Sequence, residues 1–177
     1  CDVIWFDINY MDEFRVFTIN DRDFPDPKRM NKYLHDNGFH SVYMIDPGVK
    51  VDDNYFVYKT GKEQNAFVCD IYRNEFHGKV WPGACAFPDF TRPETRTWWS
   101  GLYKDFMANG IDGIWNDMNE PSVFDGPGGT MPENNIHLGG GNLPIGSHLM
   151  YHNAYGRLMV EASYNGMMAA NPGKRPF

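Results

Sequence analysis

One stretch decides the fold: Gly110-Ile111-Asp112-Gly113-Ile114-Trp115-Asn116-Asp117-Met118-Asn119-Glu120-Pro121. The apolar run at residues 111–115 is typical of a buried strand, and Pro121 prevents that strand from continuing. Alternate residues of a strand share a face, so Trp115 and Asp117 point the same way. A carboxylate beside an aromatic side chain at a strand end suits the wall of a pocket. A solvated aspartate that simply ends the strand is the ordinary alternative.

Two earlier stretches repeat this pattern. Residues 3–6 form an apolar run that closes on Asp7, and residues 41–45 form another that closes on Asp46. Continuous apolar runs separated by helical patterns are typical of parallel strands buried on both faces. In a βα barrel the loops after the strands form one face, and the chemistry collects there. We therefore predict an α/β fold in which three strands deliver Asp7, Asp46 and Asp117 to one face.

Three helices are predicted around these strands. Each has an N-terminal residue whose side chain can cap the first turn and a recognisable C-terminal signal. The signals are Asp26 and Asn37-Gly38 for the first helix, a Thr91 and Glu94 capping box and Gly110 for the second, and Ser147 and Pro172-Gly173 for the third, which is predicted to run to Ala170.

The connection at residues 50–90 is much longer than an ordinary βα loop. Residues 54–59 and 65–72 are predicted to be short strands. Long ordered loops in compact domains tend to be functional, so we predict a small β-rich insertion over the mouth of the barrel, after the second strand of the chain. Pro82 stiffens the segment beside Trp81, which would hold that ring in one orientation. A packed lid residue is the plainer interpretation of Trp81.

Composition excludes several function classes. A chain of 177 residues can bury the core of one ordinary domain. A net charge of -7 without any basic run argues against a nucleic-acid partner. No segment has the length of a membrane span. Because the sequence begins with Cys1 and a strand follows almost at once, we expect a fragment of a longer protein.

The cysteines predict neither a disulfide framework nor a metal site. Cys1, Cys69 and Cys85 are few and scattered, and Cys69, His77 and Cys85 do not have a usual metal-ligand spacing. We therefore expect no metal and no other cofactor. Unpaired thiols and the absence of a leader slightly favour a cytoplasmic location. Aromatic residues make up 16% of the chain, which permits sugar stacking but equally serves to fill a core.

Several motifs carry a resemblance to a known family. Trp115-Asn116-Asp117-Met118-Asn119-Glu120-Pro121 resembles the nucleophile motif of glycoside hydrolase family 31, in its α-glucosidase branch. Trp5-Phe6-Asp7-Ile8-Asn9-Tyr10-Met11 resembles the family's Trp-x-Asp-Ile-Asp-Tyr-Met segment, with Asn9 in place of the second Asp. Four further motifs match in the family's order: Asp46-Pro47-Gly48-Val49, Val80-Trp81-Pro82-Gly83, Phe87-Pro88-Asp89-Phe90 and His152-Asn153-x-Tyr155-Gly156.

The resemblance runs from end to end and implies a (β/α)8 TIM barrel. Residues 1–177 would supply about the second to fourth strands of a single catalytic domain, with the remainder of the barrel as partner. The implied activity is that of a retaining α-glucosidase acting on an oligosaccharide or another α-glucoside. Its nucleophile would be Asp117, and Asp7 would accept hydrogen bonds from the sugar. The implied lining residues are Ile8, Val49, Trp81, Trp115 and Met118, and the supporting candidates are Asp46, Asp89 and Glu120.

Retaining cleavage also needs a protonated carboxyl group about 5–5.5 Å from the nucleophile. In the family this acid is an aspartate on a later strand, which would lie beyond Phe177. Residues 1–177 alone are therefore expected to show no turnover.

Two alternatives stay open. Asn119-Glu120-Pro121 also resembles the acid/base signature of clan A β-glycosidases, in which Glu120 would donate the proton, although the flanking motifs favour family 31. A catalytically silent homologue could use the same aromatic side chains and Asp7 to bind glucose without cleaving it. Within the family, α-xylosidases and α-glucan lyases are possible, but the Trp-Asn-Asp-Met pattern favours α-glucosidase.

Overall fold

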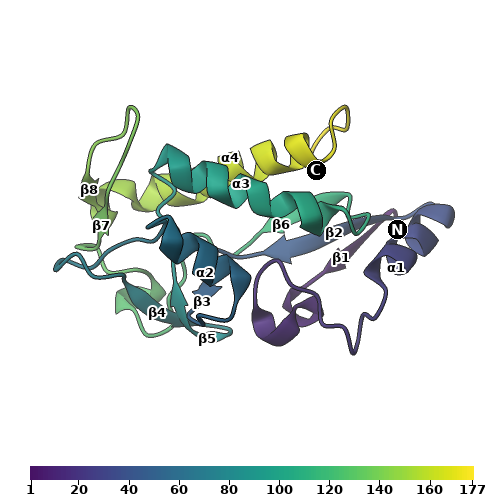
Figure 1. The fold of residues 1–177 in the computed structure, drawn as a ribbon, viewed down its shortest axis with the longest axis horizontal. Helices are drawn as coiled ribbons and strands as arrows, with labels where there is room; N and C mark the ends of the chain where they lie inside the picture. Colours follow the sequence, from purple (N-terminus) through teal and green to yellow (C-terminus); the bar gives the residue numbers. More distant parts are fainter.

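The centre of the fold is a parallel sheet of three strands. Figure 1 shows the computed structural model, which describes all 177 residues. The strands are β1 (Val3–Phe6), β2 (His40–Ile45) and β6 (Gly113–Asn116), in the order β1-β2-β6. Both pairings are parallel, so the carboxyl ends of all three strands lie at one edge. The three predicted strands and their common direction are confirmed.

The two faces of this sheet have different partners. On one face, Tyr43 of β2 stacks on Phe6 of β1 at 4.4 Å between ring centroids and packs edge-on against Phe106. On the other face, Trp5 and Trp115 meet edge to face at 6.1 Å. This alternation follows from the two-residue period of a strand. The first face is covered by helices, and the second carries Trp5 and Trp115, which stand two positions before the strand-end aspartates Asp7 and Asp117.

Helix α1 (Pro27–Asp36) connects β1 to β2, and its predicted limits are confirmed. The Asp26 side chain accepts a hydrogen bond from the Arg29 amide at 2.9 Å. Gly38 follows the helix with a φ of 81°, a conformation that glycine adopts without steric cost.

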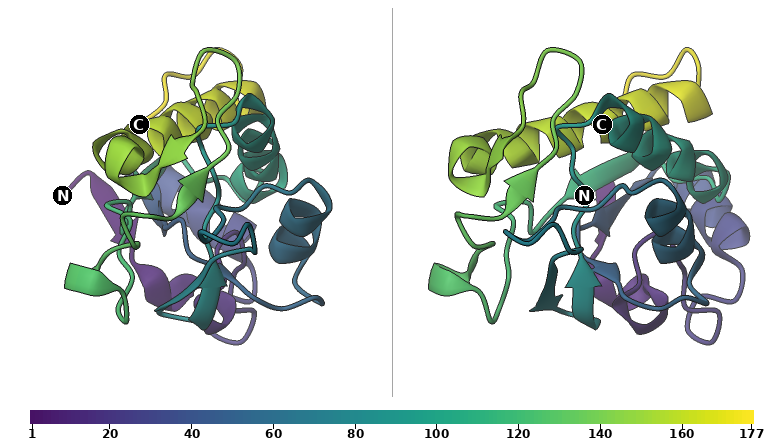
Figure 2. Two further views of the ribbon diagram at one scale, coloured as in Figure 1. Left: turned by 90° about the vertical axis from the view of Figure 1, so that its left-hand side faces the viewer. Right: turned by 60° about the vertical axis from the view of Figure 1, so that its left-hand side comes forward.

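Helices α3 (Pro93–Met107) and α4 (His148–Ala170) precede and follow β6 and lie side by side over the sheet (Figures 1 and 2). The capping box predicted for α3 is wrong. The helix starts after Arg92 without a side-chain cap, because the Thr91 hydroxyl donates to Asp89 instead. Ser147 precedes α4, but its side chain makes no capping hydrogen bond.

The segment at residues 50–90 is mixed in structure rather than β-rich. Residues 54–59, predicted as a strand, lie mostly in helix α2 (Phe56–Glu63). The buried residues of α2 are Val57, Tyr58 and Gly61, which have the three- and four-residue spacing of one helix face. Because Val57 and Tyr58 are residue types that favour strands, this helical spacing was not recognised in the sequence. Residues 65–72 make only isolated bridges, such as Phe67 to Pro88.

Short strands complete the fold. β3 (Val49–Lys50), β4 (His77–Val80) and β5 (Gly83–Ala86) form an antiparallel sheet in the order β3-β5-β4. β7 (Ile136–His137) pairs with β8 (Gly146–Ser147) beside the start of α4. Single-turn helices η1 (Ile8–Tyr10), η2 (Asp12–Phe14) and η3 (Pro127–Gly129) lie in the loops. No helix is both long and apolar enough to span a bilayer.

The core is aromatic and lies between the parallel sheet and the helices. Its largest fully buried side chains include Trp99 and Tyr103 of α3, Tyr155 of α4 and Tyr43 of β2. Phe17 packs edge-on against both Trp99 and Tyr103, each at 5.0 Å between ring centroids. Edge-to-face pairs of this kind add to the stabilisation from burial alone. This core fixes the sheet whose edge carries the candidate site.

Candidate active site

Three aspartates leave the parallel sheet at the same edge. Asp7 follows β1, Asp46 follows β2 and Asp117 follows β6. The register aligns Ile45 with Asn116, and the Asp117 amide donates to the Ile45 carbonyl at 3.1 Å. In each of the three strands, the residue two positions before the aspartate lies on the sheet face that carries Trp5 and Trp115. The sheet therefore places these three residues at one rim.

Asp117 is half-buried, and its carboxylate accepts no hydrogen bond from the 177 residues. The next residue, Met118, has a left-handed φ of 56°. Its carbonyl accepts from the Ser122 amide at 3.0 Å, which closes a turn after β6. A half-buried carboxylate without an internal partner, on a fixed backbone, is available to a ligand.

Asp7 is exposed and sits at the start of η1. One of its carboxylate oxygens accepts from the Ile8 amide at 2.7 Å, which orients the side chain. Ile8 itself is half-buried and packs against the core. The second carboxylate oxygen of Asp7 has no partner within the chain and can accept a hydrogen bond from a ligand.

Asp46 is buried at the end of the central strand, with 1% of its surface exposed. One oxygen accepts from the Gly48 amide at 3.0 Å, and the other is buried without a partner. Burial raises the pKa of Asp46 to about 7, the Gly48 hydrogen bond opposes that rise, and the Asp117 charge adds to it. Asp46 is therefore largely uncharged in mildly acidic solution.

The predicted lining residues differ in how much surface they offer. Trp115 is half-buried, whereas Val49 at the start of β3 is fully buried. Trp81 lies in the turn between β4 and β5, 49% exposed, and meets Phe124 edge to face at 5.1 Å. Because Phe124 belongs to the loop after Asp117, this contact joins the residue 50–90 segment to that loop. Two cavities of about 480 Å³ lie elsewhere on the chain, and neither is lined by a predicted site residue.

Glu120 is exposed and accepts a hydrogen bond from the Ser122 hydroxyl at 2.7 Å. It stands three residues past Asp117, in a turn that also contains Pro121. Its carboxylate is thus engaged within its own loop.

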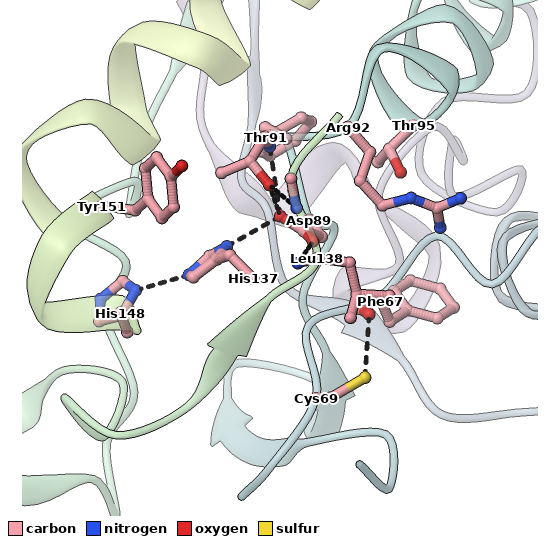
Figure 3. A network of polar contacts seen from close by, with 12 residues as sticks. Phe67, Cys69, Asp89, Thr91, Arg92, Thr95, His137, Leu138, His148 and Tyr151 are labelled. Carbon is pink, nitrogen blue, oxygen red and sulfur yellow. Dashed lines mark hydrogen bonds and ion pairs between the residues drawn. The ribbon is translucent and has the colours of Figure 1, made fainter. Parts of the chain in front are cut away.

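Asp89 belongs to a buried polar network that the sequence did not reveal (Figure 3). It accepts from the Thr91 hydroxyl at 2.6 Å, from the Leu138 amide at 2.6 Å and from His137 Nδ1 at 2.8 Å. His137 Nε2 in turn lies 3.0 Å from His148 Nδ1. The network joins the segment before α3 to β7 and to the first residue of α4.

Burial and hydrogen bonding act in opposite directions on this network. Burial alone would raise the pKa of Asp89. The hydrogen bond and electrostatic attraction from His137, together with the hydrogen bonds from Thr91 and Leu138, outweigh burial and hold this pKa below its ordinary value. For His148, burial and the neighbouring His137 and His152 lower the pKa to about 3. Sequence analysis missed this network because His137 lies in a Gly- and Pro-rich region without periodicity, and nothing in the sequence pairs it with His148 at the start of the next helix.

Comparison with known proteins decides the family. A family model described as "Glycosyl hydrolases family 31 TIM-barrel domain" matches residues 1–177. The chain belongs to glycosyl hydrolase family 31. Its fold class is accordingly that of the family 31 TIM-barrel domain, with the mixed α/β elements described above.

Curated family 31 relatives match across the whole chain. "Alpha-glucosidase 2" of Bacillus thermoamyloliquefaciens is 44% identical over 176 residues, which cover 99% of this chain and 22% of the relative. "Neutral alpha-glucosidase C" of Homo sapiens is 39% identical over 180 residues, covering 99% of this chain and 19% of the relative. The chain thus spans about a fifth of the length of these relatives.

Solved family 31 structures share the fold. The glucosidase II alpha subunit, in a form described as alpha3-Glc2-bound, matches with a TM-score of 0.90 and 40% identity, over 99% of this chain and 19% of that chain. The family 31 alpha-glucosidase from Bacteroides thetaiotaomicron matches with a TM-score of 0.82 and 54% identity, over 100% of this chain and 27% of that chain.

Proposed function

We propose that this family 31 chain supplies the nucleophile side of a retaining α-glucosidase site, with Asp117 as the nucleophile. The substrate class is an oligosaccharide or another α-glucoside with a terminal α-linked glucose. The observation that carries the proposal is the shared rim, at which β1 and β6 flank β2 and deliver Asp7 and Asp117 beside Trp5 and Trp115. The α-glucosidase names of relatives at 39% and 44% identity support the same reaction.

The reaction needs two carboxyl groups with different protonation states. The ionised Asp117 oxygen attacks the anomeric carbon and forms an ester, while a protonated acid gives its proton to the leaving glycosidic oxygen. The same acid, now a carboxylate, then takes a proton from water. The resulting hydroxide displaces Asp117 from the anomeric carbon, which releases glucose with its configuration retained. The acid/base residue would come from outside residues 1–177.

Substrate binding falls to the residues around this rim. Asp7 would accept hydrogen bonds from the sugar hydroxyls through its unpartnered oxygen. Aromatic rings stack on sugar faces, which is the role proposed for Trp81 and Trp115. The smaller apolar contributions are assigned to Ile8 and Met118. The prediction that Val49 lines the site is not kept, because Val49 is fully buried in the core and has no surface to offer a sugar.

The open sheet favours a partial barrel. In a closed barrel every strand has two neighbours, but β1 and β6 each pair only with β2. Trp5 on β1 is 53% exposed. We therefore propose that residues 1–177 supply about the second to fourth strands, that the remainder of the barrel flanks β1 and β6, and that residues 50–90 lie over its mouth. Residues 1–177 alone would then show no turnover.

The decisive experiment traps the ester in the polypeptide that carries residues 1–177 within a complete catalytic domain. A fluorinated glucosyl fluoride that accumulates the glucosyl-enzyme should add one sugar to the peptide containing Asp117, as read by mass spectrometry. Asp117→Asn should abolish both the label and turnover, because the amide cannot form the ester.

Glu120→Gln is the matched variant, since it neutralises a carboxylate three residues away in the same loop. It should still be labelled on Asp117. Labelling that persists in Asp117→Asn, together with turnover lost in Glu120→Gln, would instead support the clan A interpretation. Glucose binding without any labelling of the unmodified protein would support a catalytically silent sugar-binding protein.

A further inference from the structure

Helix α4 holds the end of β6 through Ser163. The Ser163 hydroxyl donates to the Asn116 side-chain oxygen at 2.7 Å, and Asn116 directly precedes Asp117. Ser163 is fully buried and also lies 2.8 Å from the hydroxyl of Tyr103 on α3. The residue just before the proposed nucleophile is therefore tied through its side chain to α4, and through Ser163 to α3.

The same helix touches the loop just after the nucleophile. At Gly156, an added Cβ would lie 2.9 Å from the Asn119 carbonyl oxygen and 3.3 Å from its Nδ2. A glycine inside a helix normally lowers stability relative to alanine. Its presence here allows α4 to approach the loop more closely than any side chain would permit. This gives a physical reason for the glycine of the His152-Asn153-x-Tyr155-Gly156 motif.

Between these two contacts the backbone is fixed and strained. The Asp117 amide is bonded to the Ile45 carbonyl at 3.1 Å, and Met118 adopts a φ of 56°. A non-glycine residue in the left-handed region persists only where the surrounding structure determines it. Ser163 and Gly156 are the α4 residues that bear on the two ends of this segment.

We propose that Ser163 and Gly156 are positioning residues for Asp117. They fix the backbone of residues 116–119 so that the Asp117 carboxylate is held where it can attack the anomeric carbon. The inference rests on the proposed function of Asp117 and adds two residues on α4 that do not touch the sugar. A nucleophile displaced by about 1 Å can lose about a hundredfold in rate, so a partial loss of this support should be measurable.

Ser163→Ala tests the hydrogen bond in the polypeptide with its complete catalytic domain. The rate of trapping by the fluorinated glucosyl fluoride and kcat should both fall by about tenfold. The Kd for glucose should change by less than about twofold, because Asp7 and Trp81 come from other elements. Ser100→Ala is the matched control: its hydroxyl joins α3 to α4 by bonding the Ala162 carbonyl at 2.7 Å, without touching β6. That variant should be trapped at the unmodified rate.

Gly156→Ala tests the close approach and does not depend on the first variant. It should lower the trapping rate by about tenfold or more, because Asn119 and the residues before it must shift. Gly101→Ala on α3 is its control, since a Cβ there meets nothing within 4 Å. If Gly156→Ala does not fold, Ser163→Ala and its control decide the question.

The outcomes separate this inference from the proposed function. If the unmodified protein is trapped on Asp117, but Ser163→Ala and Gly156→Ala react as fast as their controls, the positioning role is wrong and the function stands. Equal rate losses in Ser163→Ala and Ser100→Ala would show a merely structural contact and also overturn it. If the unmodified protein is never trapped on Asp117, the proposed function fails, and this inference fails with it.

Discussion

Two aspartates in this chain are equally buried and have opposite protonation behaviour. Asp46 is 1% exposed, and its pKa is raised to about 7. Asp89 is 0% exposed, and its pKa is held below the ordinary value. Asp46 accepts one hydrogen bond, from Gly48, and faces the charge of Asp117. Asp89 accepts from Thr91, His137 and Leu138.

The difference shows that burial alone does not set the charge of a carboxyl group. Desolvation disfavours the ionised form at both positions, and the number of donors decides the result. Asp89 remains charged because its donors replace the water it has lost, so it can hold two segments together. Asp46 is left short of donors beside a second carboxylate, so its charged form is a source of instability next to the candidate nucleophile.

The largest expected effect comes from Asp89→Ala. It leaves the Thr91 hydroxyl, the Leu138 amide and His137 buried without their acceptor. Leaving a buried donor without its acceptor costs about 1–3 kcal/mol, and three donors lose theirs here, so the total cost should be about 3–5 kcal/mol. We expect a loss of that size in the free energy of unfolding at pH 7, measured by urea denaturation of the polypeptide that carries residues 1–177.

Asp70→Ala is the control for Asp89→Ala, because Asp70 is a loop aspartate that accepts from the Tyr72 and Asn74 amides at 2.8 and 2.9 Å but is only half-buried. Its loss should be well below that of Asp89→Ala. Equal losses would mean that burial of the network does not matter, and the comparison of the two buried aspartates would no longer hold.

Asp46→Asn should act in the opposite direction. Because the folded-state pKa of about 7 lies above the unfolded value, the folded protein binds the extra proton between these two values. The free energy of unfolding therefore falls as pH rises through that window. Asparagine never ionises, so the shift of about three pKa units, at about 1.4 kcal/mol each, should make the variant more stable than the unmodified protein by about 4 kcal/mol at pH 8.

The difference between Asp46→Asn and the unmodified protein should shrink to about 0.5 kcal/mol at pH 4, where Asp46 is protonated in the folded state and about half protonated in the unfolded state. Unfolding midpoints in urea at pH 4, 6 and 8 give the measurement. A variant that is less stable at pH 8 would show that Asp46 is charged and well solvated in the folded protein.

The sheet could be predicted from sequence because its signals are local. Each strand is a continuous apolar run that ends on an aspartate, so the run and its last residue can be read within seven positions. Parallel pairing then forces Asp7, Asp46 and Asp117 to one edge whatever the rest of the chain does. Their chemical roles came from the resemblance to family 31, and those roles stay predictions.

The errors lie where distant contacts override local preference. Tyr58 and Val57 favour a strand, but Gly61 of the same segment packs against Phe67 and Trp98, and that packing selects a helix. The capping box failed because the Thr91 hydroxyl has a better acceptor in Asp89.

The same limit applies to the buried network. Asp89 and His137 are 48 positions apart, and His148 lies in a helix that was predicted without reference to either residue. Only tertiary structure brings the three together, so no pattern within the sequence could have identified them.

The smallest expected effect is that of His148→Gln on the acid dependence of stability, which tests the Asp89 network at its far end. His148 has a pKa of about 3 in the folded protein, below its unfolded value, so the unfolded state binds more protons as pH falls below about 6.5. The stability that neutral His148 contributes is therefore lost on acidification from about pH 6.5 toward 3. His148→Gln cannot gain that charge, so its free energy of unfolding should fall by about 1 kcal/mol less than that of the unmodified protein between pH 7 and 5, allowing for partial screening.

His40→Gln, at a side chain that is 65% exposed, should leave the acid dependence nearly unchanged. If both variants respond to acid as the unmodified protein does, His148 is already solvated or charged in the fold, and the dry environment that we assign to the Asp89 network does not extend to α4.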